Sequence, residues 1–249
     1  MNFRKFESFL FDLDGCIWVY PKLIEGSAEI CEKLKKLGKQ VLIITNFSVL
    51  SRKETMKKLR LLGLEFDNLI TSTYVIAQFL KGKKCRVMAF GEGVEKELKD
   101  NKIKVVKKLP VDYLVVGHDL NFNYEKLNLS YHAINQGAKF LYASRGKIWV
   151  TSKGSFPGTS AIVKSIQFVT GKRGILFGKP SRFMASFIDS QVCSPRKKVV
   201  LFGDELDSDI KLAKQLNYFS VLVKSGVDKE VKGKIKPELV LNSIAEIKL

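Results

Sequence analysis

The chain has 249 residues and a formal net charge of +18, from 43 lysines and arginines against 25 aspartates and glutamates. Hydrophobic residues make up 45% of it, enough to bury one substantial core or two smaller ones. No apolar run reaches the roughly 20 residues of a membrane-spanning helix, and Glu7 and Asp12 interrupt the first apolar stretch before it could act as a signal sequence. We therefore expect a soluble, cytoplasmic protein that does not bind a membrane.

The positive charge has two interpretations. Lysine and arginine neutralise phosphates, so a nucleic acid or another acidic partner is one possibility. The basic residues are spread along the whole chain, however, without a basic-aromatic repeat. In the first basic stretch, Ile30, Leu34 and Leu37 form the apolar stripe of a helix whose lysines lie on the solvated side. We therefore expect a lysine-rich surface and no specific nucleic-acid partner.

The first predicted element is a buried strand, FESFLF (residues 6–11), and it ends at two aspartates. Side chains alternate in an extended chain, so Asp12 and Asp14 point to the same side. Two ionised carboxylates at the end of a buried strand cost several kcal/mol unless a positive group joins them. The sequence therefore suggests a bound cation, with an acidic turn at Asp14 and Gly15 as the alternative.

Strand-like runs then alternate with amphipathic helical stretches along the chain. After the first strand we expect helices near residues 26–38 and 51–62 around the strand QVLIIT (40–45), and late strands at KKVVLF (197–202) and YFSVLV (218–223). This alternation predicts an α/β protein with a largely parallel sheet. The strand-like runs end at polar residues: Asp12, Thr45 and Asn46, Lys179, and Asp204. Because the carboxyl ends of parallel strands share one edge, we expect these groups to converge on one pocket.

The converging side chains suit phosphoryl transfer. Carboxylate oxygens at Asp12 and Asp204 suit Mg²⁺, which prefers carboxylates, water and phosphate oxygens. Thr45 and Asn46 can offer hydrogen-bond donors to a phosphate, and Lys179 a fixed positive charge. The chain has no Walker-type phosphate loop. The nucleophile must therefore come from elsewhere, and an aspartate carboxylate can serve.

Four motifs in order resemble those of the haloacid dehalogenase (HAD) superfamily of aspartate-nucleophile phosphatases. They are DLDG (12–15), TN (45–46), GKP (178–180) and GDELDSD (203–209). Further segments resemble its NagD-like, para-nitrophenyl-phosphatase-like branch: TSTYVIAQFL (71–80), VVGHDLNFNYEKL (115–127), GAKFLYAS (137–144), PGTSAIV (157–163) and FGKPS (177–181). The resemblance covers nearly the whole chain.

The resemblance implies a role for each catalytic residue. Asp12 would attack phosphorus, form an aspartyl-phosphate and also contact Mg²⁺. Asp14 would protonate the leaving alcohol and later activate water, while its backbone carbonyl would be a metal ligand. Lys179 would balance negative charge and orient Asp12. The two aspartates would thus need opposite protonation states as the leaving group departs.

The same resemblance assigns the remaining site residues. Asp204 would bind Mg²⁺, and Asp209 would complete or brace the metal shell. Thr45 and the backbone of Asn46 would hold the phosphate. Two other acids of this motif, Glu205 and Asp207, are as consistent with solvated positions or a helix N-terminus as with a metal site. His118 and His132 are interpreted as structural histidines.

The resemblance also divides the chain into a Rossmann-like catalytic core, residues 1–81 and 177–249, and an inserted α/β cap domain, residues 82–176. Substrate choice should lie in the cap. Here the chain departs from the branch, reading YASRG where an A-T-N-x-D pattern is common. We expect this loop to face the leaving group, where the Arg145 guanidinium would suit a second phosphate or carboxylate. An exposed surface cation is the alternative.

The sequence as a whole predicts Mg²⁺-dependent hydrolysis of small phosphomonoesters through an aspartyl-phosphate. The expected partner is a small phosphorylated metabolite. A phosphotransferase using the same intermediate is one alternative. A basic protein that binds nucleic acid or an acidic partner on this scaffold is another, although the intact motifs favour an enzyme.

Overall fold

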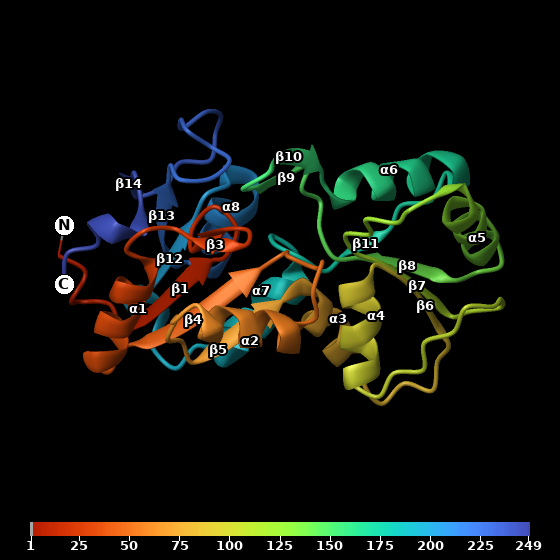
Figure 1. Cartoon of the computed structure of the whole chain (residues 1–249), viewed down its shortest axis with the longest axis horizontal. Helices are drawn as coiled ribbons and strands as arrows, with labels where there is room; N and C mark the ends of the chain where they lie inside the picture. Colours follow the sequence, from red (N-terminus) through yellow and green to blue (C-terminus); the bar gives the residue numbers. More distant parts are fainter. Residues whose placement is uncertain (1) are drawn as a thin grey trace.

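The computed structural model describes residues 2–249, which fold around two parallel β-sheets (Figure 1). The larger sheet has six strands in the order β14-β13-β12-β1-β4-β5, and every neighbouring pair is parallel. Its strands are β1 (Ser8–Asp12), β4 (Gln40–Thr45), β5 (Asn68–Thr71), β12 (Val199–Gly203), β13 (Phe219–Val223) and β14 (Leu239–Leu241). The predicted α/β class with a parallel sheet is confirmed.

Both faces of the larger sheet are covered, which explains why its central strands are continuously apolar. On one face Phe9 and Phe11 of β1 pack with Phe202 of β12, with ring centroids of Phe11 and Phe202 4.9 Å apart. Leu10 points to the opposite face and joins a separate buried cluster. Helices α1 (Ser27–Lys36) and α2 (Arg52–Leu61) cover the first face; α3 (Ser72–Leu80), α7 (Arg182–Gln191) and α8 (Lys211–Leu216) cover the second.

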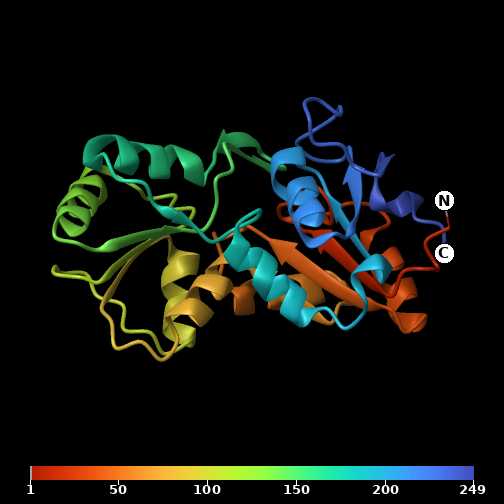
Figure 2. The ribbon, with the colours of Figure 1, turned by 180° about the vertical axis from the view of Figure 1, so that it is seen from behind.

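The smaller sheet has four parallel strands in the order β11-β8-β7-β6. They are β6 (Val87–Phe90), β7 (Tyr113–Val116), β8 (Lys139–Tyr142) and β11 (Ile175–Leu176), and the accompanying helices are α4 (Glu92–Asp100), α5 (Tyr124–Asn135) and α6 (Thr159–Thr170). Figures 1 and 2 show this lobe beside the larger one, with both chain termini at the far end of the larger lobe. The domain bounds at residues 81/82 and 176/177 stay a prediction.

Two short antiparallel hairpins and three helical turns complete the chain. Strands β9 (Ile148–Thr151) and β10 (Gly154–Pro157) form one hairpin, and β2 (Trp18–Val19) and β3 (Lys22–Leu23) form the other. The turns are η1 (Arg196–Lys198), η2 (Leu206–Ile210) and η3 (Ile244–Glu246). The β9–β10 hairpin packs back onto the larger lobe, where the Ser152 N–H donates to the Tyr20 carbonyl at 3.0 Å. No helix among residues 2–249 is long and apolar enough to cross a membrane.

The strand before Lys179 does not belong to the sheet that carries the other strand-end residues. β11 pairs with β8 in the smaller sheet, whereas β1, β4 and β12 are neighbours in the larger one. The expectation that all four runs end at one edge of one sheet is therefore wrong for this segment. An apolar run of this length indicates a strand but carries no information about which sheet it joins. Lys179 lies where the chain returns from the smaller sheet to helix α7.

Candidate functional site

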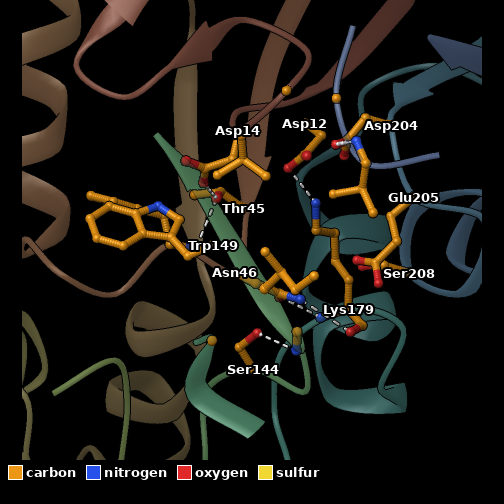
Figure 3. A pocket seen from close by; sticks show the side chains of 18 of the residues that line it. Asp12, Asp14, Thr45, Asn46, Ser144, Trp149, Lys179, Asp204, Glu205 and Ser208 are labelled. Carbon is orange, nitrogen blue, oxygen red and sulfur yellow. Dashed lines mark hydrogen bonds and ion pairs between the residues drawn. The ribbon is translucent and has the colours of Figure 1, made fainter. Parts of the chain in front are cut away.

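All seven predicted site residues line one cavity of about 110 Å³ at the carboxyl end of β1, β4 and β12. They are Asp12, Asp14, Thr45, Asn46, Lys179, Asp204 and Asp209. In the view of Figure 3, Asp14, Asp12 and Asp204 lie in a row above the Lys179 ammonium, with Asp12 between the other two. The convergence of these groups thus holds, although Lys179 arrives from a different sheet.

The two N-terminal aspartates are separated by a tight turn. β1 ends at Asp12, which is buried, and the chain turns at Gly15, whose φ of +77° is a left-handed conformation that favours glycine. The Gly15 N–H donates to the Trp18 carbonyl at 2.7 Å, which closes the turn. The turn keeps Asp14 on the cavity side while Leu13 is buried in the core.

Lys179 is the cation of the site. Its side chain is only 2% exposed, and its Nζ lies 2.5 Å from Asp12 Oδ1 and 2.6 Å from Asp209 Oδ1. Burial alone would lower the pKa of Lys179, but the charges of Asp12 and Asp209 outweigh it and raise the pKa above its usual value. Lys179 is therefore a permanent ammonium held between two carboxylates.

Three buried carboxylates lie together at this site, two of them in contact with the ammonium, and the three fit a divalent cation. One oxygen each from Asp12, Asp204 and Asp209 lies within 4.8 Å of the other two. Burial raises the pKa of all three, that of Asp209 to about 6. When ionised, they leave three negative charges against one positive charge, a net charge of −2 in a buried site. A hard divalent cation such as Mg²⁺ would offset it through oxygen ligands.

The surroundings of Asp204 hold its carboxylate in one place. Its Oδ2 accepts a hydrogen bond from the Val227 N–H at 2.7 Å. Gly15 and Gly226 lie so close that a methyl group on either would overlap this carboxylate. Asp209 differs, because both of its oxygens already have protein partners: Oδ1 accepts from Lys179, and Oδ2 accepts from the Glu205 N–H at 3.1 Å. This arrangement suits Asp204 to direct metal ligation and Asp209 to bracing.

Asp14 has a different environment from Asp12. Its Oδ1 accepts a hydrogen bond from the Trp18 indole at 3.0 Å, and the Thr45 hydroxyl donates to its Oδ2 at 3.5 Å. Burial raises the pKa of Asp14 to about 6, against the opposing effects of the Trp18 indole N–H, the Lys179 ammonium, the Trp149 indole and the Thr45 hydroxyl. Asp12 contacts the ammonium directly, whereas Asp14 does not. One carboxylate is thus paired with a cation, and the other can hold a proton near neutral pH.

The side chains of Thr45 and Asn46 also organise the backbone. Asn46 Oδ1 accepts from the Lys179 N–H at 2.7 Å, and its Nδ2 donates to the Lys179 carbonyl at 3.2 Å. This paired contact fixes the loop that carries Lys179 across from the smaller sheet. Thr45 Oγ1 accepts from the Phe47 N–H at 2.9 Å. The predicted contacts of Thr45 and the Asn46 backbone with a phosphate stay predictions.

Sequence reasoning missed two tryptophans and left out one acid at this site. Trp18 lies four residues after Asp14, just beyond the first motif, so its position was a usable signal for a contact with that carboxylate. Trp149 reaches the cavity from the β9–β10 hairpin, and no sequence pattern links it to the aspartates. Glu205 and the half-buried His118 also line the cavity.

The loop that carries Arg145 reaches this cavity through Ser144 and Gly146, but Arg145 itself does not line it. Its side chain is exposed, as in the alternative of a surface cation. It borders a neighbouring hollow of about 770 Å³, and its guanidinium donates to the backbone carbonyl of Asp207. Asp207 is exposed and lies outside the catalytic cavity, and His132 is exposed on α5. The arginine therefore connects the 144–147 loop of the smaller lobe to the larger lobe.

Two family models match the two ends of the chain. One, described as haloacid dehalogenase-like hydrolase, matches residues 9–104, and the other, described as HAD-hydrolase-like, matches residues 176–247. Each contains part of the cavity described above. Asp12, Asp14, Thr45 and Asn46 fall in the first match, and Lys179, Asp204 and Asp209 fall in the second.

Known proteins resemble the chain over nearly its full length. Phosphoglycolate phosphatase 2 of Arabidopsis thaliana is 31% identical, over 98% of this chain and 93% of that protein. The 4-nitrophenylphosphatase of Schizosaccharomyces pombe is 28% identical, with the same two coverages of 98% and 93%. Among solved structures, a thermostable NPPase double mutant from Geobacillus stearothermophilus superposes with a TM-score of 0.88 at 25% identity, covering 98% of this chain and 99% of that one.

Proposed function

Because the chain belongs to the haloacid dehalogenase-like hydrolases, as a phosphatase of their nitrophenylphosphatase and NagD-like branch, we propose that it hydrolyses small phosphomonoesters through a phosphorylated Asp12 with Mg²⁺ as cofactor. The observation that carries the proposal is the position of Lys179, a buried ammonium between Asp12 and Asp209 in a cavity that also holds Asp14.

In the first half-reaction, an oxygen of Asp12 attacks phosphorus and the bond from phosphorus to the ester oxygen breaks. Asp14 gives its proton to the departing ester oxygen, so that a neutral alcohol leaves. In the second half-reaction, Asp14 takes a proton from water, whose oxygen attacks the same phosphorus. Inorganic phosphate leaves and Asp12 returns to its carboxylate form. The different environments of the two aspartates support this division of roles.

Positive and hydrogen-bond-donating groups around the phosphoryl group offset its negative charge. Lys179 balances negative charge as the phosphoryl group transfers, and Thr45 and the Asn46 backbone hold its oxygens. Mg²⁺ would be held by Asp12, Asp204 and the Asp14 carbonyl, with Asp209 bracing the set, and when bound it neutralises phosphoryl oxygens. The cluster of three buried carboxylates around one ammonium supports a divalent cation at this position.

The size of the cavity favours a small substrate. About 110 Å³ accommodates a phosphoryl group and a short leaving group rather than a polymer. We therefore propose a small phosphorylated metabolite such as phosphoglycolate, a sugar phosphate or a nucleoside monophosphate. The names of the relatives, which include a phosphoglycolate phosphatase and the sugar-phosphatase AraL of Bacillus subtilis, are consistent with this class.

The test is a panel of phosphomonoesters assayed for phosphate release with Mg²⁺. We expect turnover of at least one small metabolite phosphate, its loss with EDTA, and its recovery when Mg²⁺ is restored. Asp12→Asn should abolish turnover, because an amide is nearly the same shape but a far poorer nucleophile. Asp207→Asn is the matched control, since Asp207 is exposed and outside the cavity. Undiminished hydrolysis by Asp12→Asn, or full activity of metal-free protein, would contradict the proposal.

A further inference from the structure

The catalytic cavity contains a buried hydrogen-bond donor whose geometry is poorly satisfied. Trp149 Nε1 has almost no solvent-exposed surface and makes no well-aligned hydrogen bond within residues 2–249. Its only effect on a neighbouring acceptor among these residues is on the Asp14 carboxyl, whose pKa it lowers. The two other side-chain atoms in this state, the hydroxyls of Ser27 and Ser72, do not line the cavity. Burying an N–H group without an acceptor is unfavourable, so buried donors almost always have partners. The indole therefore points to an acceptor with better geometry than the protein itself supplies.

The position of this donor is fixed by packing. Trp149 lies on β9, opposite Phe156 of β10. Its ring lies 4.9 Å from the ring of His118, 5.7 Å from Tyr20 and 6.2 Å from Phe47, measured between centroids. The hairpin is also tied to the larger lobe by the hydrogen bond between the Ser152 N–H and the Tyr20 carbonyl. The indole is therefore held in place over the cavity rather than free to turn toward water.

Figure 3 shows Trp149 next to Asp14 and Thr45, on the side away from Asp12 and Asp204. Asp12 attacks phosphorus in the proposed function, and Asp14 serves the ester oxygen, so the leaving group extends past Asp14 away from Asp12. Trp149 is therefore on the leaving-group side of the cavity. Phe47 and the half-buried His118, whose rings pack against Trp149, line the same cavity.

Asp14 itself is a poor permanent acceptor for the Trp149 indole. Its two carboxyl oxygens already accept from Trp18 and Thr45. A third donor would stabilise the charged carboxylate further and oppose the protonated form that Asp14 needs before it can give a proton to the ester oxygen. An oxygen of the substrate meets the need of the indole without this conflict.

We propose that the Trp149 indole N–H binds an acceptor oxygen on the leaving group, and that the enzyme selects phosphomonoesters with a carboxylate or hydroxyl oxygen on the carbon next to the ester carbon. The inference rests on the proposed function and adds its substrate class. Lys179 is the only lysine or arginine among the described residues that line the cavity, and it is occupied by carboxylates. The neutral Trp149 indole N–H is thus available to bind the acceptor oxygen of the leaving group.

Three phosphate esters with the same two-carbon skeleton test the proposal: ethyl phosphate, 2-hydroxyethyl phosphate and 2-phosphoglycolate. The wild-type enzyme with Mg²⁺ should show a higher kcat/KM for at least one of the two acceptor-bearing esters than for ethyl phosphate. Trp149→Phe keeps an aromatic ring and removes the N–H. It should lower kcat/KM for the preferred ester about 10- to 100-fold, chiefly through KM, and change ethyl phosphate less than about twofold.

Phe156→Leu is the matched control, because Phe156 packs on the same hairpin and does not line the cavity. It should leave the preference among the three esters unchanged. Equal losses by Trp149→Phe on all three esters would overturn the proposal and assign Trp149 to positioning Asp14 or to the fold. A wild-type enzyme that hydrolyses the three esters equally would also overturn it. Failure to hydrolyse any phosphomonoester would instead contradict the proposed function.

Discussion

Lys179 is the residue on which the electrostatics of the site depend. Among residues 2–249 it is the one ammonium paired with the carboxylates of Asp12 and Asp209, and it is 2% exposed. Replacing it with methionine would leave those carboxylates buried without their counter-charge. We therefore predict that Lys179→Met loses turnover and about 3 kcal/mol or more of the free energy of unfolding in the absence of metal. Urea denaturation in EDTA measures the stability.

Lys198→Met provides the comparison for that measurement. Lys198 pairs with Glu7 at 2.5 Å, but both side chains are more than 40% exposed. Its loss should change the free energy of unfolding far less than the loss of Lys179, because an exposed ion pair contributes little to stability. Equal changes in the free energy of unfolding of the two variants would show that the buried charge of Lys179 stabilises the fold no more than an exposed lysine does.

For individual residues, the sequence predicted which side chains would lie together in the cavity, but it did not predict all of their hydrogen bonds and packing contacts. The seven site residues follow from motifs and from the expectation that strand ends converge, and they do line one cavity. The use of the Asn46 amide to hold the Lys179 backbone was not predictable, because it depends on how a loop from the smaller sheet crosses to the larger one. Trp149 was missed for the same reason, since its side chain reaches the site only through the packing of a hairpin.

Among the elements, the loop after β12 and the segment at residues 225–227 together hold Asp204. Gly226 lies against the Asp204 carboxylate, and an added methyl group would overlap it. We predict that Gly226→Ala displaces this carboxylate and weakens Mg²⁺ binding. Wild-type protein should gain thermal stability as Mg²⁺ is added, because a ligand that binds only the folded state stabilises it. The variant should lose most of that gain, as measured by Tm against Mg²⁺ concentration.

The metal-free Tm of each protein provides the baseline for the Gly226→Ala experiment. A lower baseline alone reports only on packing. An increase in Tm equal to that of the wild type across the same Mg²⁺ range would argue against Asp204 as a metal ligand.

The elements themselves were largely predictable from sequence. The helices expected near 26–38 and 51–62 are α1 (Ser27–Lys36) and α2 (Arg52–Leu61). The second begins at a capping box, in which the Ser51 side chain accepts from the Glu54 N–H and the Glu54 side chain accepts from the Ser51 N–H. The pairing of β11 was not predictable, because two residues carry too little pattern to select between two parallel sheets.

For the molecule as a whole, the catalytic cavity depends on both sheets. The larger sheet supplies the aspartates at the ends of β1 and β12, and the segment between the lobes supplies Lys179. The smaller lobe contributes Ser144 and the hairpin residue Trp149 to the same cavity. The sequence predicted a cap inserted at residues 82–176. Which of its side chains face the cavity depends on how the two lobes pack together. This explains why Arg145, expected at the leaving group, instead contacts the Asp207 carbonyl.

In the proposed mechanism the complete enzyme passes through a phosphorylated Asp12, and trapping that intermediate is a direct test. Full-length protein with Mg²⁺ and a substrate found in the panel would be quenched in acid at several times during turnover, digested, and examined by mass spectrometry. We predict that the peptide containing residues 9–18 gains the mass of one phosphoryl group, located on Asp12, and that Asp12→Asn gains none. Continued turnover with no phosphorylated peptide at any quench time, or phosphorylation of a different residue, would contradict the account.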